Sequence, residues 1–218
     1  HLKRLLVGGL EKVYEIGRIF RNEGVSQKHN PEFTTIELYE AYSDFEGMMN
    51  LCEELISNAC ESVHSSLEVN YDGKKVDFKG PWRRMRYLES IAEFGGYSMD
   101  QLQTEESVRE LCRERNVEVD LKLPLAKLYD ALFEEVVEPH LFQPTFIYDY
   151  PKELSPLAKQ IPDQPDMTYR FEAFIANMEI ANAFSELNDP MDQHDRFKQQ
   201  MKDREQGDEE AHEMDTDY

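Results

Sequence analysis

Carboxylates, an arginine and aromatic rings are concentrated in two stretches of the sequence that have the composition of β-strands. The first is FRNEGVSQKHNPEFTTIELY at residues 20–39, and the second is FEAFIANMEIANAFSEL at residues 171–187. Side chains alternate between the two faces of a strand, so residues two positions apart share a face. Two sets of side chains therefore each share one face: Phe33, Thr35, Glu37 and Tyr39 in the first stretch, and Asn182, Phe184 and Glu186 in the second.

These residue types predict a site for a ligand that combines an ammonium group, an anionic group and a planar ring. Glu37 and Glu186, with the phenol of Tyr39, suit an ammonium group because carboxylates accept charge-assisted hydrogen bonds. Arg21 suits a phosphate or carboxylate through its planar fork. Phe33 offers a face on which a planar base can stack.

Two further carboxylates, Glu172 and Glu179, flank the turn between the late strands and suit a hard divalent cation. Taken singly, these residues also have ordinary structural roles, since an Arg–Glu pair across strands is usually a structural ion pair. Asn182 can satisfy backbone groups, Phe184 can belong to the core, and His29 lies in a polar loop. The functional interpretation depends on convergence, because three strands are expected to contribute polar groups to one concave sheet surface.

The elements that must position these groups follow from hydrophobic periodicity and turn signals. Strands are expected at 13–21, 33–42, 144–151 and on either side of a turn near Asn177, with a hairpin around Asp72-Gly73. Asp44 is expected to cap a helix that runs to about His64. Further helices are expected near 84–94, 107–115 and 124–137, and from Asp189-Pro190 to about 206. Ile36 and Leu38 are expected to be buried under helices.

The absence of regular β–α alternation excludes a doubly wound sheet, and the fold class expected is α+β with antiparallel strands. Neither GxGxxG nor GxxxxGK[ST] occurs in the sequence. The chain of 218 residues, 40% of them hydrophobic, suits one large domain or one domain with an insertion. A formal charge of −21 argues against a broad phosphate-binding surface, but not against a small anion held by local arginines.

Cysteine usage and hydropathy predict a cytoplasmic protein. The three cysteines show no CxxC and no zinc spacing, so we expect reduced thiols. No uncharged apolar run approaches the ~20 residues that span a bilayer, so no membrane association is expected.

The segment FRNEGVSQKHNPEFTTIELYEAYSDF closely resembles the second signature motif of the class II lysyl-tRNA synthetases, and of the bacterial type in particular. NMEIANAFSELNDPMDQHDRF resembles the region ahead of the third motif of that family, and YDYPKELSPLAK also fits its pattern. The resemblance runs through nearly the whole chain and is loosest between about 65 and 141. The combination of HNPEFT with SELND is highly specific.

The resemblance implies that residues 1–218 are part of a class II catalytic domain, an antiparallel β-sheet flanked by helices. The second motif would lie at about 13–45, a helical insertion at about 84–140, and the amino-acid-binding strands at about 170–188. The first and third motifs and the N-terminal anticodon-binding domain would be absent. We therefore expect no complete catalysis by the chain alone, and a homodimer for the parent protein.

The same resemblance implies ATP-dependent activation of L-lysine to lysyl-adenylate, followed by transfer to the lysine tRNA with Mg²⁺ as the metal. Arg21 and Glu23 would be the catalytic residues. The ATP site would be formed by Arg21, Glu23, Lys28, His29, Asn30 and Phe33. The lysine site would be formed by Glu37, Tyr39, Asn182, Phe184 and Glu186. Glu172 and Glu179 would hold magnesium.

Two alternatives remain open from the sequence. One is a synthetase paralogue that lysylates a protein such as elongation factor P. The other is a synthetase-like binding or regulatory module without catalytic activity.

Overall fold

The computed structural model describes residues 1–22, 24–26, 29–120 and 122–205. The helices are α1 (Leu2–Val7), α2 (Phe45–His64), α3 (Tyr87–Gly95), α4 (Glu105–Arg115), α5 (Leu125–Val136) and α6 (Pro190–Glu205). The strands are β1 (Lys12–Phe20), β2 (Glu32–Glu40), β3 (Glu68–Tyr71), β4 (Lys74–Asp77), β5 (Arg83–Arg86), β6 (Thr145–Pro151), β7 (Gln160–Ile161), β8 (Gln164–Ile175) and β9 (Met178–Phe184).

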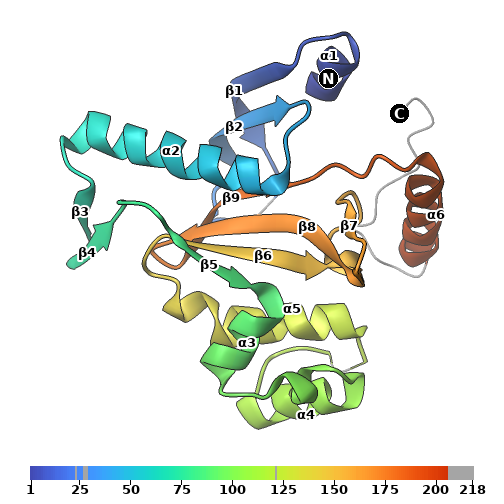
Figure 1. Cartoon of the computed structure of the whole chain (residues 1–218). Helices are drawn as coiled ribbons and strands as arrows, with labels where there is room; N and C mark the ends of the chain where they lie inside the picture. Colours follow the sequence, from blue (N-terminus) through green and yellow to red (C-terminus); the bar gives the residue numbers. More distant parts are fainter. Residues whose placement is uncertain (23, 27–28, 121, 206–218) are drawn as a thin grey trace.

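A five-stranded sheet forms the centre of the molecule, in the order β5-β6-β8, with β7 and β9 both pairing with β8 (Figure 1). β8 is long enough, at 12 residues, to pair with β7 near its beginning and with β9 near its end. The α+β class is therefore confirmed. The expectation of an antiparallel sheet is confirmed for β6, β7, β8 and β9 but not for β5, which runs parallel to β6.

Helices cover both faces of this sheet, which explains why β6 and the second half of β8 are buried almost continuously. Phe171, Ala173 and Ile175 of β8 pack with Phe45 and Met49 of α2. On the opposite face, side chains of α3, α4 and α5 form a second cluster that includes Phe174 of β8. Figure 1 shows α2 on one side of the sheet and α3, α4 and α5 on the other.

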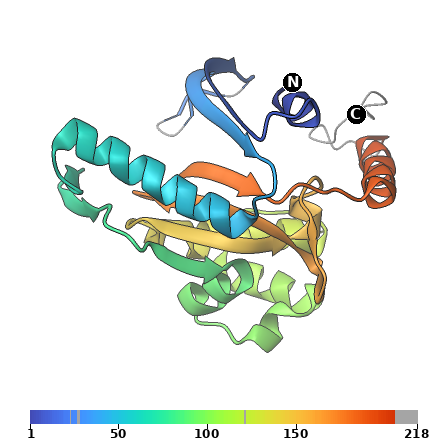
Figure 2. The same cartoon turned by 45° about the horizontal axis from the view of Figure 1, so that its top comes forward.

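Two expectations about the site are wrong for the β1–β2 hairpin. Its strands pair antiparallel with each other and, within the described residues, with no other strand. The strands of the expected site thus belong to two separate sheets. The face that carries Tyr14, Ile16 and Ile36 is also exposed, with Ile16 at 64% and Ile36 at 40%. Ile36 is therefore not buried under a helix. Figure 2 shows the hairpin projecting away from the body of the molecule.

Most of the predicted local signals are confirmed, because they depend on short-range backbone chemistry. Asp44 caps α2 by accepting a hydrogen bond from the Gly47 amide at 2.8 Å. Positive φ angles occur at Asp72 and Gly73 in the β3–β4 turn, and at Ala176 and Asn177 in the β8–β9 turn. Such paired positive φ angles match the right-handed twist of the flanking strands.

Helix boundaries in the 84–140 region differ from the expectation at one end. Residues 83–86 form β5 rather than the start of a helix, because their backbone pairs with residues 145–148 of β6. α3 therefore begins at Tyr87. The short elements α1 and β7 were not predicted, since six and two residues carry too little periodicity.

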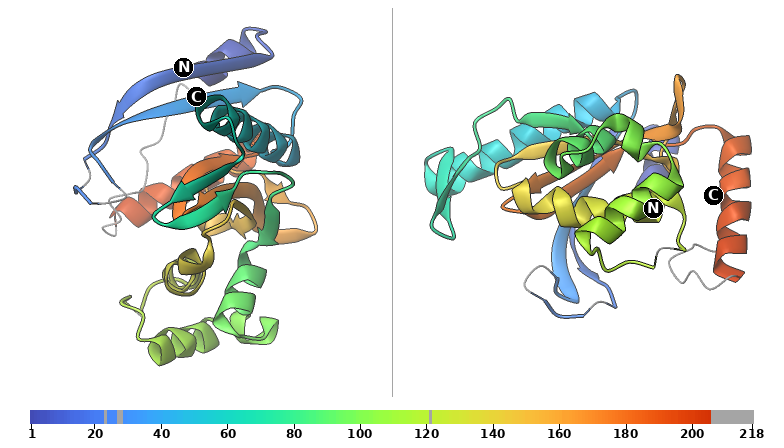
Figure 3. Two further views of the ribbon diagram at one scale, coloured as in Figure 1. Left: turned by 90° about the vertical axis from the view of Figure 1, so that its left-hand side faces the viewer. Right: turned by 90° about the horizontal axis from the view of Figure 1, so that it is seen from below.

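The polar helix α6 stands beside the β7 end of the sheet, away from α3, α4 and α5 (Figure 3). Arg196 links α6 to the rest of the molecule. Its guanidinium pairs with Asp192 of the same helix and donates to the Ala158 carbonyl, outside the helix, at 2.8 Å. The three cysteines are free thiols, as predicted. None of the helices in the described ranges is long and apolar enough to cross a membrane.

Candidate functional site

The β8–β9 pair builds the centre of the candidate site. Its register places Glu172 opposite Asn182 and Arg170 opposite Phe184, so these four side chains share one face. Phe171 and Ala173, which alternate with them, lie in the core beneath α2. The alternation expected from the sequence is thus confirmed for Asn182 and Phe184.

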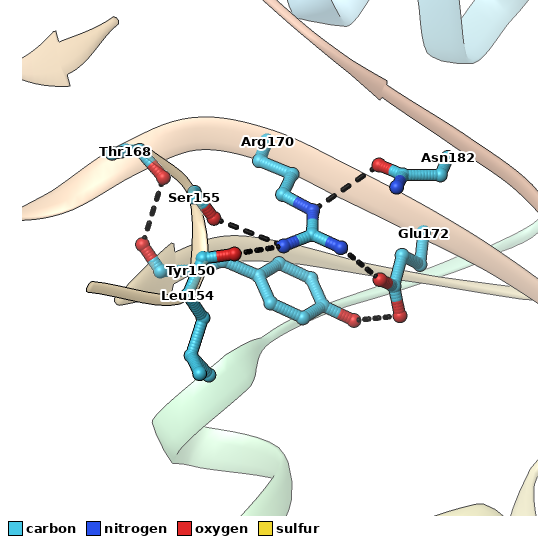
Figure 4. Close-up of polar contacts among 7 residues, drawn as sticks. All are labelled: Tyr150, Leu154, Ser155, Thr168, Arg170, Glu172 and Asn182. Atoms are coloured by element: carbon cyan, nitrogen blue, oxygen red, sulfur yellow. Dashed lines mark hydrogen bonds and ion pairs between the residues drawn. The ribbon is translucent and has the colours of Figure 1, made fainter. Parts of the chain in front are cut away.

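Arg170 is the most extensively bonded side chain of this face (Figure 4). Its Nε donates to Asn182 Oδ1 at 3.1 Å, and one terminal nitrogen donates to Glu172 Oε1 at 2.5 Å. The other terminal nitrogen donates to the Leu154 carbonyl at 2.6 Å and to Ser155 Oγ at 3.1 Å. The guanidinium thus joins β8, β9 and the segment that follows β6.

Tyr150 binds the second oxygen of the same carboxylate. Its hydroxyl donates to Glu172 Oε2 at 2.7 Å, and the guanidinium of Arg170 lies 4.7 Å from its ring centre. A register irregularity between Tyr148 and Tyr150, with φ of +58° at Asp149, accounts for this orientation. It places Tyr150 on the face of Ile147, although a regular strand would place it with Tyr148.

A lysine side chain of the protein itself occupies the predicted ammonium site. Lys3, on α1, donates from Nζ to Glu186 Oε2 at 2.9 Å. The same nitrogen lies 5.7 Å from the ring centre of Tyr39 and 6.0 Å from that of Phe184. A carboxylate and two aromatic rings therefore surround one primary ammonium group. The tertiary structure brings Tyr39, Phe184 and Glu186 together although their strands belong to different sheets.

Arg21 and Phe33 form a second group at the far end of the hairpin. The guanidinium of Arg21 lies 5.2 Å from the ring centre of Phe33, a cation–π arrangement. The charge of Arg21 also reaches Glu179, whose pKa it lowers slightly against larger opposing effects. Arg21, directly after β1, thus lies near enough to β9 for its charge to affect Glu179.

The carboxylates of Glu172 and Glu179 are close enough for the negative charge of one to affect the other. Burial raises the pKa of Glu172, while Arg170 and the hydrogen bond from Tyr150 oppose that rise. Desolvation, followed by the charge of Glu172, raises the pKa of Glu179 to about 7. Glu179 as a residue is exposed at the start of β9. A divalent cation would relieve the repulsion.

Two carboxylates fit magnesium only when other ligands complete the shell. Among the described residues, no cluster of three or more histidine, cysteine, aspartate or glutamate side chains could hold a metal ion. Mg²⁺ usually takes one or two carboxylates together with substrate phosphates and water. Glu172 and Glu179 therefore fit a cation shared with a nucleotide.

The other predicted residues lie in or near the loop of the hairpin. His29 contacts Ser26, with Nδ1 to Oγ at 3.2 Å, and Asn30 donates to the Glu32 carbonyl at 2.9 Å. Both side chains are exposed. Glu37 is also exposed and lies opposite Glu15 in the hairpin. Glu23 and Lys28 lie outside the described residues.

Three residues of this site were not predicted: Lys3, Tyr150 and Arg170. Strand parity with Glu172 was the only sequence signal for Arg170. Tyr150 lies one strand away, behind a register irregularity that no local pattern indicates. Lys3 precedes the hairpin in the sequence, and its contact with Glu186 depends on where α1 packs.

The fold is that of a class II tRNA synthetase domain, and the chain belongs to the family described as tRNA synthetases class II (D, K and N). The family model matches residues 1–218. The chain is 55% identical over its full length to a lysine–tRNA ligase of Moorella thermoacetica, and 53% identical to that of Chloroflexus aurantiacus. A lysine–tRNA ligase of Staphylococcus aureus is 49% identical. The chain spans 44–45% of the length of these relatives. The resemblance to lysyl-tRNA synthetases is thus confirmed.

Proposed function

We propose that the protein to which this chain belongs is a lysine–tRNA ligase, which activates L-lysine with ATP and transfers it to the lysine tRNA. The observation that carries the proposal is the seat of the Lys3 ammonium against Glu186, Tyr39 and Phe184. A carboxylate and two rings that hold the ammonium group of a protein lysine can make the same contacts with that of free lysine. The three relatives, each named lysine–tRNA ligase, support the same conclusion.

In this proposal the substrate ammonium replaces that of Lys3. Glu186 supplies the charge-assisted hydrogen bond, and the Tyr39 and Phe184 rings supply apolar and cation–π contacts. Asn182, held by Arg170, adds an amide from β9. Glu37 supplies a second carboxylate from the hairpin.

Arg21 is proposed to hold the α-phosphate of ATP and to stabilise the charge that develops during displacement. Phe33 offers its ring to the adenine, and Glu23, Lys28, His29 and Asn30 are proposed to contact the nucleotide from the hairpin loop. Glu172 and Glu179 are proposed to hold Mg²⁺, which neutralises phosphate charge when bound. No side chain needs to act as a nucleophile, so positioning of lysine and ATP supplies most of the acceleration.

The remaining assignments follow from the resemblance. We propose that residues 1–218 form part of the catalytic domain, with the helical insertion at about 84–140. The proposed partners are lysine, ATP and the lysine tRNA, the parent protein is a homodimer, and its location is the cytoplasm.

Substitution of Glu186 tests the lysine pocket in the full-length protein. Glu186→Gln removes the charge and keeps the shape, so it is expected to raise the KM for lysine by about 10- to 100-fold, the scale of one charge-assisted hydrogen bond. The KM for ATP should change less than threefold. The measurement is lysine-dependent ATP–pyrophosphate exchange. Glu93→Gln is the matched control, because Glu93 forms an exposed ion pair with Arg83 outside the site.

A wild-type protein without lysine-dependent exchange would overturn the proposed activity. Equal KM values for lysine in wild type and Glu186→Gln would overturn the pocket assignment alone. Aminoacylation assays that offer tRNA and elongation factor P in parallel distinguish the tRNA ligase from the protein-modifying alternative.

A further inference from the structure

We propose that Arg170 is a positioning residue of the active site, which fixes the Glu172 carboxylate and the Asn182 amide in the orientations that metal and lysine binding require. The inference rests on the proposed function, because it assigns a role to a side chain beside the proposed ligand groups. Arg170 itself lies behind Glu172 and Asn182, with a side chain only 16% exposed.

The first argument is the number and direction of the hydrogen bonds. A guanidinium has five donors in a fixed plane, and here they reach four acceptors on three segments. A lysine ammonium has three donors at one point and cannot reach acceptors so far apart. The site therefore requires arginine for its geometry as well as for its charge.

The second argument concerns the carboxylate. Oε1 of Glu172 accepts a hydrogen bond from Arg170, and Oε2 accepts one from Tyr150. These two bonds fix both the plane and the rotation of the carboxylate. Each oxygen keeps a further lone pair that a cation can use. Without Arg170 the buried carboxylate would lose its neutralising partner and would be oriented by the Tyr150 hydrogen bond alone. Partners that orient a ligating carboxylate commonly change metal affinity or activity by about 10- to 100-fold.

The third argument concerns the amide. Arg170 Nε donates to Asn182 Oδ1, so the oxygen is engaged and the NH₂ group is turned away from Arg170. The same guanidinium also holds the Leu154 carbonyl and Ser155 Oγ. Arg170 thus ties the segment after β6 to the floor formed by β8 and β9, and one substitution should disturb lysine and metal sites together.

The test compares Arg170→Gln and Arg170→Lys with wild type in the full-length protein. Exchange kinetics are measured as a function of lysine and of Mg²⁺, and thermal unfolding is recorded in parallel. We expect Arg170→Gln to raise the KM for lysine and the Mg²⁺ concentration for half-maximal rate, each by about tenfold or more. Arg170→Lys should restore only part of the loss, because it keeps the charge without the fork.

Arg115→Gln is the matched control. Arg115 donates to the Gly95 carbonyl at 2.7 Å and lies 5.5 Å from the Tyr97 ring centre, contacts of the same kinds in the distant helical region. Arg115→Gln should lower the unfolding temperature without changing the KM for lysine or the Mg²⁺ concentration for half-maximal rate.

The inference is overturned if Arg170→Gln folds and keeps the wild-type KM for lysine and the wild-type Mg²⁺ concentration for half-maximal rate. It is also overturned if Arg170→Gln changes these two values no more than Arg115→Gln does. If Arg170→Gln does not fold, Arg170→Lys decides by the same criterion. Absence of exchange in the wild type is a different result, which overturns the proposed function itself.

Discussion

At the scale of single residues, Lys3 shows which kind of group the proposed ammonium site can hold. Its ammonium group contacts one carboxylate and two rings, and its side chain remains 29% exposed. A contact of this kind is strong enough to order a flexible side chain but weak enough to be exchanged for a ligand. Free lysine would therefore have to compete with Lys3 in the 218-residue chain.

Removal of Lys3 should strengthen lysine binding by that chain. Lys3→Met keeps an unbranched side chain one atom shorter and removes the competing charge, so the Kd for lysine should fall by about threefold to tenfold, as expected for one partly exposed charge-assisted bond. Calorimetry with lysine and a non-hydrolysable ATP analogue measures the change. Lys74→Met serves as a control on the β3–β4 hairpin. An unchanged or higher Kd would show that Lys3 does not compete for the site.

At the scale of elements, irregular backbone determines which side chains meet. The register irregularity next to Asp149 turns Tyr150 toward Glu172, and the paired positive φ angles at Ala176 and Asn177 bring β9 back along β8. The site thus depends on two points where a strand departs from regular geometry. The first point lies within β6, and the second is a turn whose backbone and side chain are held by hydrogen bonds to Phe142 and Glu138.

The attachment of α6 should depend on pH through Asp192. The hydrogen bonds and charge of Arg196 lower the pKa of Asp192, so this group contributes stability that is fully present above about pH 4. The contribution is lost as the pH falls through the lowered pKa. Wild type should therefore be more stable than Asp192→Asn by about 1 kcal/mol near pH 6, and this difference should shrink as the pH falls below about 4. Urea unfolding at several pH values measures it.

Asp163→Asn, on an exposed turn, is the control for that series. A gap between wild type and Asp192→Asn that stays constant from pH 6 to pH 3 would contradict the assignment.

At the scale of the whole molecule, an exposed apolar surface and a large negative charge have opposite effects on self-association. The outer face of the β1–β2 hairpin exposes Tyr14, Ile16, Phe20 and Ile36, while the chain carries a formal charge of −21. Contiguous apolar surface favours association, whereas like charge keeps molecules apart. Salt weakens the repulsion between like charges and leaves the attraction between apolar surfaces largely unchanged.

The 218-residue chain should therefore self-associate more as salt rises. We expect sedimentation velocity to show larger species at 500 mM than at 50 mM NaCl. Ile16→Asp, which places a charge at the centre of the exposed face, should suppress them. Val63→Asp is the control, since Val63 is exposed on α2. Association that survives Ile16→Asp unchanged would assign it to another surface.

Much of the fold could be predicted because its signals are local. Caps, paired turn residues and the two periodicities located α2, the β3–β4 hairpin and the β8–β9 pair within a few residues. The same alternation predicted that Asn182 and Phe184 share a face. Residues 83–86 were predicted as helix, because a strand that depends on pairing with 145–148 leaves no distinct local pattern.

The sequence by itself determined the residue types of the site and their faces, since side-chain alternation is a property of each strand alone. The motifs also determined the family. Only the tertiary structure decided that Lys3 occupies the ammonium site, that Arg170 and Tyr150 hold Glu172, and that the hairpin forms a sheet of its own. The physical reason is distance along the chain: Lys3 and Glu186 are 183 residues apart, so the packing of α1 and the hairpin against β9 determines their contact.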